Sequence, residues 1–154
     1  MTAPPDWTVR PVQADELDQL LVLMRAYCDF YEVSPTDEDL SALMRAQLED
    51  PATEGMQLIG CDSAGALVGF ATLYWSWSTT EACRIGVMND LFVADEARGQ
   101  GLAEELIEAC RSQCARRGAR RLTWQTAPGN ARAQAVYDRV GATREQWIDY
   151  WLAT

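Results

Sequence analysis

A glycine-containing turn between an apolar run and a long helical pattern constrains the fold of this chain more than any other feature. The apolar run ends at Val93, and Arg98-Gly99-Gln100-Gly101 then leads into the helical pattern. Helix N-termini carry unpaired N–H groups and a partial positive charge, so they bind anions. The two glycines allow a sharp turn and a close approach to a ligand, and Arg98 adds a bidentate phosphate donor. The sequence therefore predicts a strand–turn–helix unit that can hold a pyrophosphate.

The same turn is also compatible with a simpler interpretation, in which the glycines serve only to connect a strand to a helix. Its glycine spacing differs from the G-x-G-x-x-G fingerprint of dinucleotide-binding proteins. The chain also lacks a G-x-x-x-x-G-K-[ST] run. Other parts of the chain must decide between a ligand site and a plain turn.

Length and composition predict one domain spanning residues 1–154, since the chain has 154 residues and is 48% hydrophobic. No apolar run has the length of a membrane span, and residues 1–6 lack the charged-then-apolar pattern of a secretory signal. The five cysteines show no C-x-x-C spacing, and most lie in apolar periodic segments. These features indicate buried free thiols, a cytoplasmic location and no membrane partner.

Charge and residue usage exclude several classes of function. The formal net charge is −10, and an acidic surface repels nucleic-acid backbones. The chain contains no histidine, which excludes histidine-based catalytic triads and imidazole metal sites. Cys110 and Cys114 share a helix face, but two ligands without a third make a poor zinc site. We therefore expect neither a metal ion nor a nucleic-acid partner.

The apolar patterns predict an α/β fold with the element order βααβββαβαβ. Hairpin-connected strands come first and crossover helices follow. This order predicts a mixed central sheet flanked by helices, antiparallel in its N-terminal half and parallel at the two central strands. The expected strands are 7–10, 56–61, 66–77, 81–93, 121–126 and 143–152, and the expected helices are 14–31, 36–50, 102–118 and 130–140.

Two motifs on these elements carry a resemblance to a known family. Arg98, Gly101 and Ala103 fit the pattern Q/R-x-x-G-x-G/A between the fourth strand and its helix. Residues 130–142 look like a second pattern, N-x-x-A-x-x-x-Y-x-x-x-G-[FA]. With both motifs on the appropriate elements, the chain resembles the Gcn5-related N-acetyltransferase (GNAT) superfamily over essentially its whole length. Within it, the sequence looks closest to small-amine, polyamine and histone-type acetyltransferases.

The resemblance implies acetyl-CoA as the cofactor. N–H groups from Gln100 to Ala103 would bind the pyrophosphate, and the backbone of Leu91 and Val93 would pair with pantetheine like an added strand. A strand N–H near Leu91 would then serve the thioester oxygen, and Asn130 would hydrogen-bond the pantetheine arm. The residues expected to bind the cofactor are Leu91, Phe92, Val93, Arg98, Gly99, Gln100, Gly101, Leu102, Ala103, Asn130, Ala133 and Tyr137.

Acetyl transfer to an amine also requires two proton transfers. The resemblance implies that Tyr137 protonates the leaving thiolate, whose pKa is close to the phenol value of about 10. Alternatively, Tyr137 only packs its ring in the core. Asp90 is the first candidate for the base, followed by Glu81 and Glu32. These carboxylates also have plainer roles, as a partner of a buried backbone donor or as solvated surface charges.

Asn89 departs from the spermidine/spermine enzymes, which carry at this position a glutamate that helps to deprotonate the amine; asparagine cannot act as that base. The acceptor expected here is a small cationic amine, because carboxylates and aromatic faces attract ammonium groups. The alternatives are a protein lysine or N-terminus, or a non-catalytic acetyl-CoA-binding module. A homodimer is also expected. The residues expected to bind the acceptor are Tyr27, Tyr31, Glu32, Trp75, Glu81 and Trp124.

Overall fold

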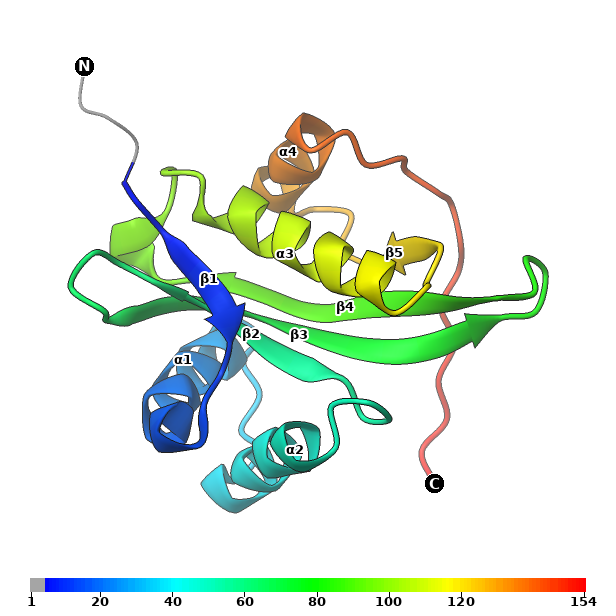
Figure 1. Ribbon diagram of the computed structural model, residues 1–154. Helices are drawn as coiled ribbons and strands as arrows, with labels where there is room; N and C mark the ends of the chain where they lie inside the picture. Colours follow the sequence, from blue (N-terminus) through cyan, green and yellow to red (C-terminus); the bar gives the residue numbers. More distant parts are fainter. Residues whose placement is uncertain (1–4) are drawn as a thin grey trace.

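Helices cover both faces of one sheet in the computed structural model, which describes residues 5–154 (Figure 1). The helices α1 (Leu17–Phe30) and α2 (Asp37–Glu49) lie on one face, and α3 (Leu102–Arg116) and α4 (Ala131–Arg139) lie on the other. Two short 3₁₀ helices, η1 (Ala14–Glu16) and η2 (Asp95–Ala97), precede α1 and α3. The first four residues, which belong to the segment without a signal pattern, lie outside the described residues.

Within the described part of the chain, the sheet has five strands in the order β1-β2-β3-β4-β5. The first three pairings are antiparallel, and β4 with β5 is parallel, which confirms the predicted mixed sheet. The parallel pair lies at one end of this sheet rather than at its centre, because no other strand among residues 5–154 pairs with the far edge of β5. The strands are β1 (Thr8–Pro11), β2 (Met56–Cys61), β3 (Leu67–Ser78), β4 (Cys83–Val93) and β5 (Arg121–Thr123).

The predicted final strand, 143–152, is wrong. Residues 142–154 form neither helix nor strand and run along the outside of the molecule (Figure 1). Side chains in this segment that suit a strand, such as Trp147 and Tyr150, are 81% and 89% exposed. A strand requires a paired edge, and the aromatic and aliphatic content of the segment indicates only that it would suit one. The element order therefore ends at α4.

Two apolar cores hold the helices to the sheet. One lies under α3 and includes Leu73, Met88 and Leu106. The other lies between the sheet and the α1–α2 pair and is centred on Leu20 and Phe70, which are 0% and 1% exposed. Burial of large apolar side chains stabilises such cores by roughly 1.5–3 kcal/mol each. All five cysteines are buried and free, as predicted.

The start of α2 shows how local sequence sets an element boundary. Thr36 Oγ1 accepts a hydrogen bond from the backbone N–H of Asp39 at 3.1 Å, so it caps the helix. At the end of α1, Tyr31 is the last residue of the turn, and Glu32 adopts a φ of 55°. This sharp reversal leaves Tyr31 at the C-terminal end of α1, where its side chain is partly exposed to solvent.

Candidate functional site

A cleft of about 620 Å³ opens where four parts of the chain meet. These are the end of α1, the second half of β4, the turn before α3, and α4 with the segment that leads into it. β5 pairs with β4 only from Ile85 to Val87, so the same edge of β4 has no strand partner from Met88 to Val93 among residues 5–154. The cleft therefore exposes backbone groups of β4 along one wall.

The turn before α3 provides one end of the cleft. Gly99 and Gly101 have φ values of 73° and 90°, which are backbone conformations that residues with a Cβ rarely adopt. Within residues 5–154, the N–H groups of Gly101 and Leu102 donate no hydrogen bond, and a Cβ at Gly101 would meet nothing within 4 Å. Free donors at the start of a 15-residue helix, facing open space, suit an anionic ligand.

Arg98 lines the cleft, but its guanidinium is already engaged by the protein. Its Nε donates to the carbonyl oxygen of Val93 at 2.8 Å, and its terminal nitrogen pairs with Asp95. The guanidinium carbon also lies 5.7 Å from the centre of the Phe92 ring. These contacts hold the turn against the end of β4, so the backbone N–H groups rather than Arg98 are the free donors.

A β-bulge in β4 sets which side chains face the cleft. Asp90 pairs with Thr72 and Met88 pairs with Leu73, so Asn89 has no partner of its own. The extra residue reverses the alternation of side chains. Met88 therefore packs under α3, whereas Phe92 packs on the α1 face, although an unbroken strand would put both on one face. Sequence periodicity did not predict this bulge.

Tyr137 lies on the α4 wall, where its ring contacts Trp124 edge-on with ring centres 5.3 Å apart. Burial raises the pKa of Tyr137, with a smaller effect from nearby Tyr31. Asn130 begins α4, and its side-chain oxygen accepts from the N–H of Ala133 at 3.1 Å. Its amide NH₂ donates to no group in residues 5–154, so it remains available to a ligand.

Asp90 lies behind the cleft rather than in its lining. Burial raises the pKa of Tyr27, and nearby Asp90 raises it further. Tyr27 lines the cleft, and its ring contacts that of Tyr31 with centres 5.0 Å apart. Asp90 also raises the pKa of Tyr74, which lies outside the cleft lining and is raised chiefly by burial. Tyr27 and Asn89 thus both line the cleft next to Asp90.

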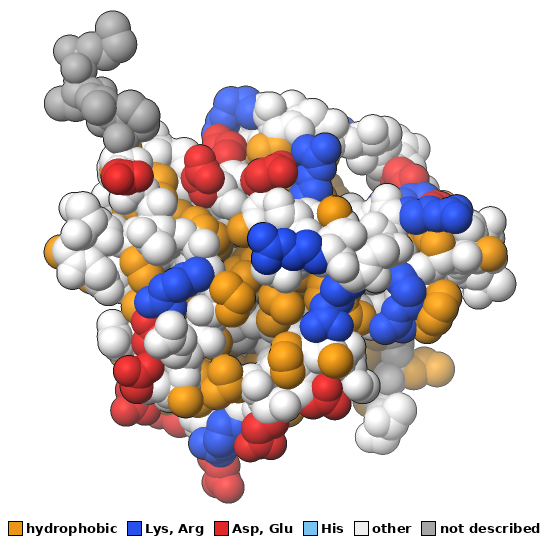
Figure 2. Space-filling view, viewed as in Figure 1, with side chains coloured by type: hydrophobic (Ala, Val, Ile, Leu, Met, Phe, Trp, Pro, Cys, Tyr) orange, Lys and Arg blue, Asp and Glu red, His pale blue; other side chains and the backbone are white. Residues whose placement is uncertain are grey.

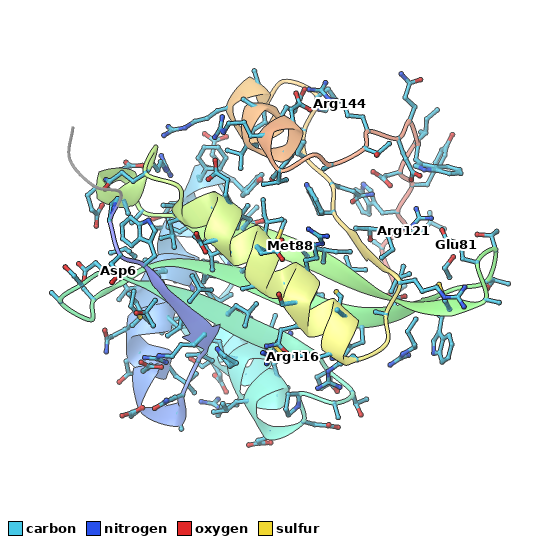
Figure 3. All side chains as sticks on the ribbon, turned by 45° about the horizontal axis from the view of Figure 1, so that its top comes forward. Asp6, Glu81, Met88, Arg116, Arg121 and Arg144 are labelled. Atoms are coloured by element: carbon cyan, nitrogen blue, oxygen red, sulfur yellow. The ribbon has the colours of Figure 1, made fainter. Side chains whose placement is uncertain are left out.

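Three residues expected at the acceptor lie elsewhere. Glu81 pairs with Arg121 near the tip of the β3–β4 hairpin (Figure 3). Trp75 donates its indole N–H to the carbonyl of Pro51 at 2.9 Å, and Glu32 is exposed outside the cleft lining. An ion-paired carboxylate and a hydrogen-bonded indole could not be recognised from sequence spacing. All three are left out of the proposed acceptor site.

The other expected site residues line the cleft or adjoin it. Trp124 and Tyr31 both face the cavity, and so do Leu91, Val93 and the remaining turn residues apart from Gln100. Sequence reasoning missed Phe30 and Met88, and it missed the charged residues Glu104, Arg132 and Arg139. Phe30 could have been predicted from the sequence, because it is an aromatic residue at the end of the first helix and directly precedes Tyr31.

Residues 5–154 show neither a metal centre nor a membrane-spanning helix. No group of three or more histidine, cysteine, aspartate or glutamate side chains there is arranged to hold a metal ion. None of the helices in this part of the chain combines the length and the hydropathy needed to cross a membrane.

Comparison with known proteins identifies the family of the chain. The sequence model described as "Acetyltransferase (GNAT) family" matches residues 20–142. The chain is 30% identical over 133 residues to the uncharacterized N-acetyltransferase YhfO of Bacillus subtilis, covering 86% of this chain and 87% of that protein. It is 26% identical to the thialysine N-epsilon-acetyltransferase of Caenorhabditis elegans, covering 84% and 78%.

The fold is also that of solved acetyltransferase structures. A crystal structure of a probable acetyltransferase superimposes with a TM-score of 0.83 at 27% identity, covering 96% of this chain and 97% of that one. The match of the family model over most of the chain and the strand–turn–helix cleft agree with each other. The chain therefore belongs to the GNAT family and is an N-acetyltransferase that uses acetyl-CoA.

Proposed function

We propose that this enzyme moves an acetyl group to the primary amine of a small cationic acceptor by direct attack. The observation that carries the proposal is the composition of one cleft. Free backbone donors at the turn, an unpaired stretch of β4 and the phenol of Tyr137 all border the same cavity, next to an aromatic wall of Tyr27, Phe30 and Tyr31.

The residues present fit acetyl-CoA, which supplies an activated acetyl group as a thioester. The N–H groups of the turn from Gln100 to Ala103 would bind the diphosphate, because they open the N-terminus of α3. The unpaired edge of β4 at Leu91 and Val93 would hold the pantetheine as an added strand. An N–H of this strand is then suited to stabilise negative charge on the carbonyl oxygen.

Tyr137 is the proposed general acid. It lines the same cavity as the β4 edge, and burial raises its pKa, so the phenol stays protonated at neutral pH. The ordinary pKa values of a phenol and an alkyl thiol lie within about two units of each other, so a phenol can protonate the departing sulfur. Asn130, at the N-terminus of α4, would orient the pantetheine arm through its free amide NH₂.

Asp90 is the proposed base, acting through Tyr27. The ammonium proton would pass to the oxygen of Tyr27 while the phenol proton passes to Asp90, so no charge remains on the tyrosine. Tyr27 packs beside Phe92, two positions along β4 from Asp90, and it lines the cleft; both observations support this route. Asn89 also faces the cleft, but it donates its amide to Asp90 at 3.0 Å and cannot accept the proton.

The acceptor is inferred from charge and shape. The net charge of −10 creates a negative electrostatic potential that attracts cations. Acidic side chains gather at the edge of the molecule formed by α1 and α2 (Figure 2). Aromatic faces at the end of α1 add attraction for an alkyl ammonium group. The relative from C. elegans is named for thialysine, a small amine, which supports a small acceptor over a protein one.

The proposal includes a cytoplasmic homodimer. Five buried free cysteines favour a reducing compartment. Large apolar side chains at the C-terminal end of the chain are 79–91% exposed, and a second copy of the chain would cover them. They are Trp147, Ile148, Tyr150, Trp151 and Leu152.

An acetylation screen with free-thiol release as the readout tests the function. The purified chain is given acetyl-CoA with spermidine, 1,4-diaminobutane, neutral and acidic amino acids, an aminoglycoside or a lysine peptide. We expect turnover with the diamine or the polyamine, and a loss of that turnover in Tyr137→Phe. If diamines and polyamines are inert while neutral or anionic amino acids react well, the acceptor class is wrong and the acetyl-CoA chemistry stands. Preference for the lysine peptide identifies a protein acceptor.

A further inference from the structure

Trp7 connects the start of the chain to the turn before α3. Its indole Nε1 donates a hydrogen bond to the carbonyl oxygen of Gln100 at 3.0 Å, across 93 positions of sequence. The ring itself packs against the core under α3. The beginning of β1 accordingly passes beside this turn (Figure 1). Trp7 is not part of the cleft lining, so it lies behind the turn and touches it from the outside.

The bond acts on the peptide group between Gln100 and Gly101. In a trans peptide, the carbonyl and the following N–H point in opposite directions, and no cis peptide bond occurs among residues 5–154. Holding the Gln100 carbonyl toward Trp7 therefore directs the Gly101 N–H to the other side of the turn. Gly101 lines the cleft, and its N–H has no partner in residues 5–154.

The turn does not fix this orientation by itself. Gly99 and Gly101 lie on either side of Gln100, and glycines reach alternative backbone conformations at little steric cost. The side chain of Gln100 bonds to the carbonyl of Glu96 at 2.9 Å, which anchors the residue but not the direction of its own carbonyl. Among the hydrogen bonds of the described residues, only that from Trp7 reaches the Gln100 carbonyl.

We propose that Trp7 is a positioning residue for the diphosphate of the cofactor, because it fixes the Gly101 N–H in the direction from which an anion would be bound. This inference rests on the proposed cofactor site at the turn. It predicts a loss that is selective. Affinity for CoA depends on Trp7, whereas affinity for pantetheine, which lacks the nucleotide and the diphosphate, does not.

The test compares Trp7→Phe with the wild type by calorimetry, using CoA and pantetheine as separate ligands. Phenylalanine keeps an aromatic ring in the core and removes the N–H donor. One neutral hydrogen bond corresponds to a change of roughly three- to tenfold in affinity. We expect CoA binding to weaken by this factor, pantetheine binding to stay unchanged, and the KM for acetyl-CoA to rise while kcat at saturation stays the same.

Trp75→Phe is the matched control, because it also removes one indole-to-carbonyl hydrogen bond, at Pro51 and outside the cleft lining. Its CoA affinity should equal that of the wild type. If Trp7→Phe loses stability, 3-benzothienylalanine at position 7 keeps the two-ring shape without the N–H. Unchanged CoA affinity in these Trp7 variants would overturn the inference and leave the cofactor site intact. Equal losses for CoA and pantetheine would overturn it too, and a wild type that binds no CoA would refute the cofactor site itself.

Discussion

At the scale of single residues, two phenols from different elements divide the proposed proton transfers. Tyr137 comes from α4 and Tyr27 from α1, and both line the cleft. Burial is the largest cause of the raised pKa at each phenol. A phenol that stays neutral can donate a proton or relay one, but it does not hold a negative charge at neutral pH.

Replacement of Tyr137 by phenylalanine should lower kcat about 10²-fold or more, the usual scale of acid–base assistance, with little change in stability. The raised pKa of Tyr137 also fixes the pH dependence, because an acid must be protonated to act. In the wild type, kcat should therefore show no falling limb below a pH of about 10. Tyr150→Phe is the control, since Tyr150 is 89% exposed. Near-normal kcat in Tyr137→Phe with saturating substrates would make this tyrosine structural.

Tyr27→Phe and Asp90→Asn should each lower kcat/KM for the amine that the enzyme accepts. Because the two groups act in series, the double variant should be no slower than the slower single variant. Tyr74→Phe is the matched control, since Tyr74 is also near Asp90 but lies outside the cleft lining. Independent, multiplicative losses, or an equal loss in Tyr74→Phe, would exclude a relay through Tyr27. The rates of all these variants are measured as thiol release, in both the pre-steady state and the steady state.

At the scale of elements, close packing of α3 on β4 holds the wall of the cleft opposite α1. A Cβ at Gly86 would lie 2.3 Å from the sulfur of Cys114, so a larger residue there requires the cysteine side chain or α3 to shift. Gly86 belongs to the short parallel pairing with β5, and β4 is free of β5 beyond Val87. The two strands therefore separate next to this close approach of α3 to β4.

Gly86→Ala should lower the free energy of unfolding by about 1–3 kcal/mol, the usual cost of overpacking. Cys114→Ala in the same chain should recover part of this loss, because it removes the sulfur that the new methyl group meets. Gly129→Ala serves as a control, since a Cβ there meets nothing within 4 Å. Urea denaturation measures the wild type, Gly86→Ala, Cys114→Ala, the double variant and Gly129→Ala. Additive losses in the double variant would show that the two positions do not conflict.

Most elements could be predicted from sequence because their signals are local. The apolar spacing of α1 and α3, the Thr36 cap and the turn at 62–65 all act within a few residues. The β4 bulge and the unpaired segment after α4 could not be predicted, since each depends on how a distant strand pairs. In the site, motif spacing identified the turn, Asn130 and Tyr137. It did not reveal that Glu81 has an ion-pair partner, Arg121.

At the scale of the whole molecule, the exposed C-terminal segment is the feature that a single copy of the chain leaves unexplained. It carries five large apolar side chains that are 79–91% exposed. An aromatic side chain buries roughly 150–250 Å². Together the five approach the roughly 800 Å² that each partner contributes to an interface of standard size. This area supports the proposed homodimer.

Sedimentation equilibrium at micromolar concentrations should give a dimer, and serine at both Trp147 and Trp151 should shift it to a monomer. Serine at Trp77 is the control, because this tryptophan is also exposed, at 66%, but lies in β3 near the hairpin tip. A wild type that sediments as a monomer throughout the range would refute the dimer. A dimer that survives both substitutions would locate the interface elsewhere.

Binding of CoA to the turn before α3 is the central claim, and calorimetry with a Gly101→Asp variant tests it most directly. The new carboxylate would stand in the open space in front of the turn and repel the diphosphate, with an expected loss of roughly 100-fold in affinity. Gly65→Asp matches the backbone strain, since Gly65 has a φ of 84° and also faces open space. We predict that the wild type and Gly65→Asp bind CoA alike while folded Gly101→Asp does not. Equal CoA affinity in all three folded proteins would contradict the account.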